Sequence, residues 1–215
     1  MSNFEPWQKY PDLTRDRLSV IATIIRDVRH RCVMLHEPDE GDGPWSLGCR
    51  AYERICFAIG KASVMHNWIK RLPEKSSLAF SFAIGNVPFR FYRGNPDDPP
   101  FHYQAKSYGE VHHIQLCLAL DLGGDITALD GVLRLAVEIS NLEVSTVTLV
   151  EMDSDGNPVD SYLIPFDEGD TNVVSIEAPP PIVTPPAIAE PLQKEEEKKE
   201  DDEKRERGHG IGSGS

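Results

Sequence analysis

The sequence predicts an α+β fold, in which two antiparallel N-terminal helices pack on a mostly antiparallel sheet of about seven strands. Apolar residues recur every three or four positions as far as residue 71, and every second position from residue 77 onward. After Glu177 the composition changes to proline and then to charge. We therefore predict a single domain over residues 1–177 and a disordered, acidic tail over residues 178–215.

The first helix is predicted from Thr14 to His36, with Asp12 or Thr14 as its cap. Its apolar stripe consists of Leu18, Ile21, Ile25, Val28, Cys32 and Leu35. A second helix is predicted from Pro44 to Arg71, since proline suits the first helical position and Pro73 would stop the helix. The short acidic loop between them favours an antiparallel pair.

The best specified element is a hairpin that turns at Gly85-Asn86. This turn would pair Ile84 with Val87, Phe82 with Phe89, and Phe80 with Phe91 on one face. Because Pro88 has no N–H to donate, its strand should lie at a sheet edge or carry the proline at an outward-facing position.

Further strands are predicted over residues 101–108 and 111–122, with one helical turn over residues 125–130. A three-stranded antiparallel meander is predicted over residues 131–166, closed by the turn at 153–158. Residues 131–140 could instead form a helix, but their strict alternation favours a strand.

The charge is distributed unevenly along the chain. Residues 1–106 hold 15 Lys and Arg against 12 Asp and Glu, whereas residues 107–215 hold 7 against 23, and the net charge is −13. The two halves could complement each other within one fold, or the basic half could meet an acidic partner.

The N-terminus lacks the basic start and apolar core of a signal peptide, and no stretch of 18 apolar residues predicts a membrane span. The four cysteines form no CxxC pair, and three lie within apolar patterns. We expect reduced, buried thiols and a cytoplasmic protein, with Cys49 and Cys56 in the seam between the helices.

No pattern predicts a metal or a cofactor. Neighbouring side chains of a strand point to opposite faces, so His112 and His113 could not share a site. His102 could join one of them if strands 101–108 and 111–122 paired, which leaves a small histidine-dependent hydrolase or nuclease as one alternative function.

Because no catalytic signature is present, the leading hypothesis is a non-enzymatic adaptor or accessory subunit that binds a protein partner or forms a homo-oligomer. The alternative is a nucleic-acid-associated protein that uses the basic face of the helices. Aromatic and arginine side chains dominate binding energy at interfaces. The candidate binding residues are Arg26, Arg29, Arg50, Arg54, Trp68, Arg90, Phe91, Tyr92 and Arg93.

Overall fold

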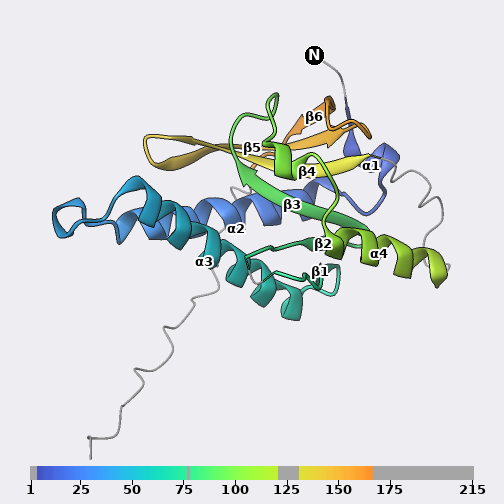
Figure 1. Ribbon diagram of the computed structural model, residues 1–215, viewed down its shortest axis with the longest axis horizontal. Coiled ribbons are helices and arrows are strands. Elements are labelled where there is room, and N and C mark those ends of the chain that lie inside the picture. Colours follow the sequence, from blue (N-terminus) through green and yellow to red (C-terminus); the bar gives the residue numbers. More distant parts are fainter. Residues whose placement is uncertain (1–3, 77, 121–130, 167–215) are drawn as a thin grey trace, which may run out of the picture. The chain divides into compact units, whose positions relative to one another are not determined.

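The computed structural model describes residues 4–76, 78–120 and 131–166, and it has the α+β fold that the sequence predicts (Figure 1). The helices are α1 (Pro6–Lys9), α2 (Arg15–Met34), α3 (Pro44–Met65) and α4 (Tyr108–Ala119), with short 3-10 turns at Pro38–Glu40 and Phe101–Tyr103. The strands are β1 (Ile69–Arg71), β2 (Phe82–Ile84), β3 (Val87–Arg93), β4 (Val132–Ser140), β5 (Glu143–Met152) and β6 (Pro158–Leu163). The predicted tail and the turn at 125–130 lie outside the described residues.

The predicted pair of long helices is confirmed. The Thr14 side chain caps α2 by accepting a hydrogen bond from the backbone N–H of Arg17, and α3 begins at Pro44. The prediction that α3 continues to Arg71 is wrong, because the helix ends at Met65 and Ile69–Arg71 forms strand β1. Ile69 is β-branched and pairs with Ile84, so pairing with the sheet overrides the helical pattern.

The described strands form one sheet in the order β1-β2-β3-β4-β5-β6, and β3–β4 is the parallel pair among antiparallel neighbours. The predicted hairpin register is confirmed at two of its three pairs, with Ile84 opposite Val87 and Phe82 opposite Phe89, whereas Phe80 precedes β2 and meets Phe91 only through a ring contact. The predicted meander is confirmed as β4, β5 and β6, which excludes the helical alternative for residues 131–140.

Strand β3 is not an edge strand, because it lies between β2 and β4. Its proline is tolerated there for a local reason. Pro88 lies opposite Ala83, and the pairing with β4 involves only Arg90–Arg93. The missing N–H of Pro88 therefore leaves no gap in the β3–β4 ladder.

The two strands predicted over residues 101–108 and 111–122 do not form. Residues 101–103 make a 3-10 turn and α4 occupies Tyr108–Ala119. Ser107 and Glu110 build a capping box: the Ser107 side chain accepts a hydrogen bond from the Glu110 N–H, and the Glu110 carboxylate accepts one from the Ser107 N–H. These bonds fix the start of a helix where the alternation of apolar residues indicated a strand.

The main core lies between the sheet and the helices α2 and α3, and strand alternation divides the side chains between the two sheet faces. Phe89 and Phe91 of β3 point into this core together with Leu133 and Leu135 of β4. On the opposite face Tyr92, Val132, Ala136, Val150 and Met152 form a smaller cluster, against which Tyr103 packs. The helix pair therefore has one face committed to the core and one face turned away from it.

Candidate interaction groove

Helix α3 carries a second row of side chains that winds across its outer surface, beside the face that it buries. Its buried face consists of Leu47, Ala51, Ile55, Ala58, Ile59 and Ala62. The outer row has a spacing of four and consists of Trp45, Cys49, Glu53, Phe57, Lys61 and Met65. The apolar members are strongly exposed: Trp45 by 81%, Phe57 by 64% and Met65 by 54%.

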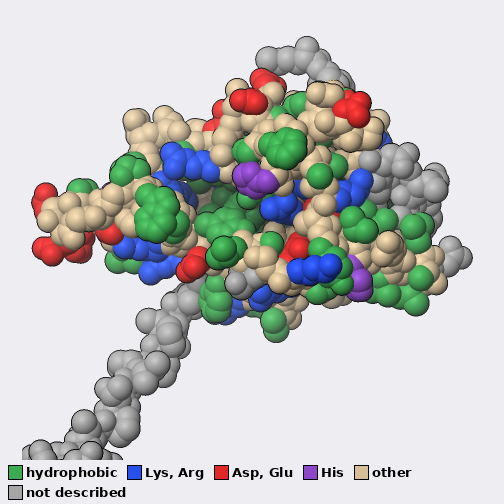
Figure 2. Space-filling view, viewed as in Figure 1, with side chains coloured by type: hydrophobic (Ala, Val, Ile, Leu, Met, Phe, Trp, Pro, Cys, Tyr) green, Lys and Arg blue, Asp and Glu red, His purple; other side chains and the backbone are tan. Residues whose placement is uncertain are grey.

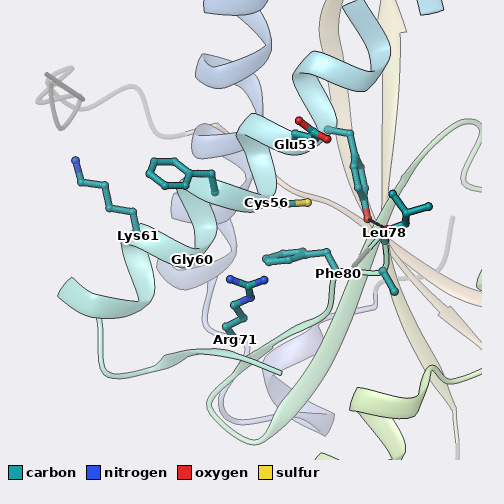
Figure 3. A pocket seen from close by; sticks show the side chains of 10 residues that line it. Glu53, Cys56, Gly60, Lys61, Arg71, Leu78 and Phe80 are labelled. Carbon is teal, nitrogen blue, oxygen red and sulfur yellow. Dashed lines mark hydrogen bonds between the residues drawn. The ribbon is translucent and has the colours of Figure 1, made fainter. Parts of the chain in front are cut away.

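An open groove of about 560 Å³ runs beside this outer row (Figure 3). One wall is α3 itself, where Tyr52, Cys56 and Gly60 form the neighbouring row of spacing four. The other wall is built from Arg71 at the end of β1 and from the segment that leads into β2. That segment contributes Leu78, Ala79 and Phe80. In the space-filling view, hydrophobic and basic side chains border a hollow beside α3 (Figure 2).

Aromatic contacts hold the walls of the groove in place. The Tyr52 ring packs against Phe91 at 5.3 Å between centroids, and its hydroxyl donates a hydrogen bond to the Leu78 carbonyl at 3.4 Å. Phe80 packs edge-on against Phe91 at 6.3 Å, and the Arg71 guanidinium lies 5.8 Å from the Phe80 ring. The groove floor is thus attached to the main core through Phe91.

Two polar groups in the groove wall, the Tyr52 hydroxyl and the Cys56 thiol, are neutral at physiological pH. Burial raises the pKa of the Cys56 thiol to about 12, and burial also raises the pKa of the Tyr52 hydroxyl. A thiol with such a pKa is protonated at pH 7 and is a poor nucleophile. The charged side chains around the groove are Glu53 and Lys61, which lie about two turns apart on α3, and Arg71 on the other wall (Figure 3).

Three of the predicted binding residues are buried. Phe91 lies in the main core, Tyr92 lies in the cluster on the opposite sheet face, and Arg29 is only 4% exposed. Arg29 donates from its Nε to the Leu142 carbonyl at 2.8 Å. Trp68 is half-buried beneath the guanidinium of Arg17, 5.6 Å from the ring. Phe91, Tyr92, Arg29 and Trp68 therefore contribute to the packing of the domain.

The predicted arginines are dispersed over the fold. Arg26 pairs with Asp27 and lies over the Phe166 ring, while Arg50 bonds both carboxylate oxygens of Asp42. Arg90 stacks on Tyr103, with its Cζ 4.3 Å from the ring centroid. The exposed pair, Arg54 on α3 and Arg93 at the end of β3, belongs to different elements.

The histidines do not form the paired-strand site that the hydrolase alternative requires. His102 is exposed in the 3-10 turn and stacks on Tyr103, while His112 and His113 lie on α4. His113 is buried 3.6 Å from the Cys117 sulfur, and burial lowers the pKa of the imidazole while raising that of the thiol. Burial therefore disfavours a thiolate–imidazolium pair. Among residues 4–76, 78–120 and 131–166, no three His, Cys, Asp or Glu side chains gather as a metal site would need.

The expectation of buried thiols, with Cys49 and Cys56 in the seam between the helices, is corrected at both of these positions. Cys32 and Cys117 are buried, whereas Cys49 is exposed on the outer row of α3 and Cys56 is half-buried in the groove wall. Within the described part of the chain, no helix combines the length and the apolar character that a membrane crossing demands. Comparisons with protein-family models, with curated proteins and with solved structures find no match to this chain.

Sequence reasoning missed Glu53, Phe57, Lys61 and Leu78 as candidates. A signal was available, because Trp45, Cys49, Phe57 and Met65 lie at multiples of four along the helix and outside the face that it buries. An apolar row that is not needed for the core is the feature by which a helical interaction surface can be found from sequence.

Proposed function

We propose that the protein acts without catalysis, as an adaptor or accessory subunit that binds a protein partner through the groove beside α3. The observation that carries this proposal is the pair of strongly exposed apolar side chains, Phe57 and Leu78, that border a groove with aromatic, well-packed walls. Exposed apolar side chains around a groove, with charges at its margin, are typical of protein-binding sites.

The energy available at this surface is large enough for specific binding. An aromatic side chain buries about 150–250 Å² in full, so covering the 64% of Phe57 that is exposed would contribute roughly 3 kcal/mol at about 25 cal/mol per Å². Trp45 and Leu78 are more exposed still, at 81% and 82%. Rotational and translational losses oppose these gains, so several such anchors are needed together.

The nucleic-acid alternative has weaker support in the geometry. Phosphate binding requires basic side chains that are free to face one backbone. Arg26, Arg50 and Arg90 instead contact an aspartate or an aromatic ring within the domain, and Arg29 is buried. Lys61 and Arg71 near the groove remain as the basic margin of a mainly apolar surface.

We place this activity in the cytoplasm, because the four cysteines are free thiols. The test is affinity purification from native extract with the full chain as bait. The variants Phe57→Glu and Leu78→Glu each introduce a charge that binding of the partner would bury. Leu163→Glu is the matched control, because Leu163 is also exposed, by 61%, but lies on a different element, β6.

The proposal requires that a partner recovered by the wild type and by Leu163→Glu is lost with both groove variants, and that nuclease treatment leaves it bound. A partner retained by the groove variants would contradict the proposed surface. Recovery of nucleic acid, with the associated proteins released by nuclease, would favour the basic-face alternative.

A further inference from the structure

The outer row of α3 is complementary to itself. Glu53, Phe57 and Lys61 follow one another at a spacing of four, so an acid and a base lie on opposite sides of an exposed aromatic ring. At about 1.5 Å per residue, Glu53 and Lys61 are about 12 Å apart along the helix, each about 6 Å from Phe57. Reversing the direction of this row exchanges the positions of its two charges.

The groove beside this row leaves room for part of a second helix. It lies between α3, where Tyr52, Cys56 and Gly60 form the row next to that of Glu53, Phe57 and Lys61, and the segment of Leu78, Ala79 and Phe80. When rows of spacing four on two helices run along each other, the helices cross at about 50°. Gly60 has no side chain to fill the groove, and a Cβ built there meets nothing within 4 Å.

We propose that the partner on this row beside the groove is a second copy of the chain, packed through α3 about a two-fold axis at Phe57. This inference rests on the proposed function and names its partner. The two α3 helices run antiparallel, Phe57 packs against its own mate, and Glu53 of each copy faces Lys61 of the other.

Charge complementarity favours a second copy over an unrelated partner. A two-fold interface presents the same patch on both sides, so each contact between different residues occurs twice. An acid and a base placed symmetrically about the axis residue give two attractive contacts, whereas an isolated charge on such an axis would repel its own mate. Because the row is short, the dimer should dissociate at micromolar concentrations.

The decisive experiment uses charge reversal in the full chain. Glu53→Lys and Lys61→Glu each convert two attractive contacts into two repulsive ones, and both side chains are exposed or half-exposed, so the fold should survive. Sedimentation velocity from 1 to 200 µM should show the wild type passing from 24.0 kDa to twice that mass. Each single variant should weaken the dimer by about tenfold or more, as exposed pairs of this strength imply.

The double variant Glu53→Lys/Lys61→Glu restores both attractive contacts and should dimerise like the wild type. An equimolar mixture of the two single variants should form a heterodimer, because one copy then carries two bases and the other two acids. Single variants that dimerise as well as the wild type would overturn the proposal, and so would a double variant that remains as weak as either single one.

A second measurement tests the axis. In a Cys49→Ser background, Phe57→Cys should give a disulfide-linked dimer on mild oxidation, because facing Cα atoms on the axis come within the reach of a disulfide. The control Val64→Cys is 86% exposed on the same helix, but its two copies would lie about 20 Å apart along the axis. Equal crosslinking at both positions would refute the two-fold arrangement.

The outcomes separate this inference from the proposed function. A chain that stays monomeric at 200 µM, and that still loses an extract partner on Phe57→Glu, retains the proposed function and refutes the homodimer. A dimer insensitive to Phe57→Glu, together with an extract partner equally insensitive to it, refutes both.

Discussion

A buried ion pair attaches α4 to the face of the sheet opposite the helix pair. The side chains of Arg134 and Glu110 are 0% and 2% exposed, and Arg134 Nη1 lies 2.6 Å from a Glu110 carboxylate oxygen. The guanidinium also donates to the backbone carbonyls of Tyr103, Ala105 and Leu133 at 2.7 to 2.8 Å. Each guanidinium nitrogen therefore has an acceptor in the interior of the domain.

Replacing Glu110 by Gln keeps the size and the acceptor oxygen of the side chain but removes the negative charge. Burial already lowers the pKa of Arg134, and Glu110 is the largest opposing influence, so its loss leaves a desolvated cation without a counterion. Breaking a buried pair in this way costs about 3–5 kcal/mol. For a domain of this size, about 2–4 °C of Tm is lost per kcal/mol, so we expect the melting temperature to fall by roughly 6–20 °C.

The assays are thermal and urea unfolding of the wild type, Glu110→Gln and the control Asp98→Ala, an exposed acid in the preceding loop. The control should change the unfolding free energy by less than about 0.5 kcal/mol. Replacing both partners, with Glu110→Leu and Arg134→Met, should recover part of the loss, although the three carbonyls that Arg134 satisfies stay unpaired. A cost below about 1 kcal/mol for Glu110→Gln would show that the pair is hydrated, and would refute the reasoning.

Three further outcomes follow from local geometry. Gly85 has φ +62° and a Cβ there would lie 2.1 Å from a carboxylate atom, so Gly85→Ala should cost more than about 2 kcal/mol in urea unfolding, and a neutral result would contradict the turn. Iodoacetamide at pH 8, followed by mass spectrometry, should label the exposed Cys49 well before Cys56, whose pKa is raised to about 12 by burial. Asp153 accepts hydrogen bonds from backbone N–H groups of its own turn, that of Asn157 having the largest effect, and these bonds lower the pKa of its carboxyl below the ordinary 3.8. The carboxylate therefore contributes its full stabilisation above pH 3.8 and loses it as the pH falls further. The melting temperatures of the wild type and of Asp153→Ala should converge in acid.

The hairpin and the meander could be predicted because local sequence determines them. Glycine at 85 supplies the positive φ of a two-residue turn, and the alternation on either side fixes the register. The meander follows from the same signals, with Asp153 accepting hydrogen bonds from the N–H groups of Asp155 and Asn157. In these segments the local preference and the final pairing agree.

Helix α4 was misread because its apolar residues lie on its outer face. Leu116, Leu118 and Leu120 alternate as in a strand, yet each is about half exposed. The buried side of α4 consists instead of Gly109, Glu110, His113 and Cys117. The capping box of Ser107 and Glu110 was the local signal for a helix, and it is a better indicator than alternation when the apolar residues do not form the core.

The candidate groove could be predicted only in part. Aromatic and arginine residues were selected by type, but their exposure depends on which sheet face the helices cover. Strand alternation then places Phe91 in the core and Tyr92 in the opposite cluster. Phe57 was overlooked because it lies on the outer face of α3, away from the residues that this helix buries.

The outer row of α3 is more than the scattered exposure of apolar residues that any soluble domain shows. Single exposed apolar side chains need no explanation. Here Trp45 and Phe57 belong to one row, part of that row borders a groove, and Gly60 leaves the groove without a side chain at one position. A helix needs only one apolar face to fold against a sheet, and the rings of Trp45 and Phe57 lie outside the face that α3 buries. Covering such rings removes apolar area from water, and the opposite charges of Glu53 and Lys61 on either side of Phe57 are the reason for proposing a second copy of the row as the cover.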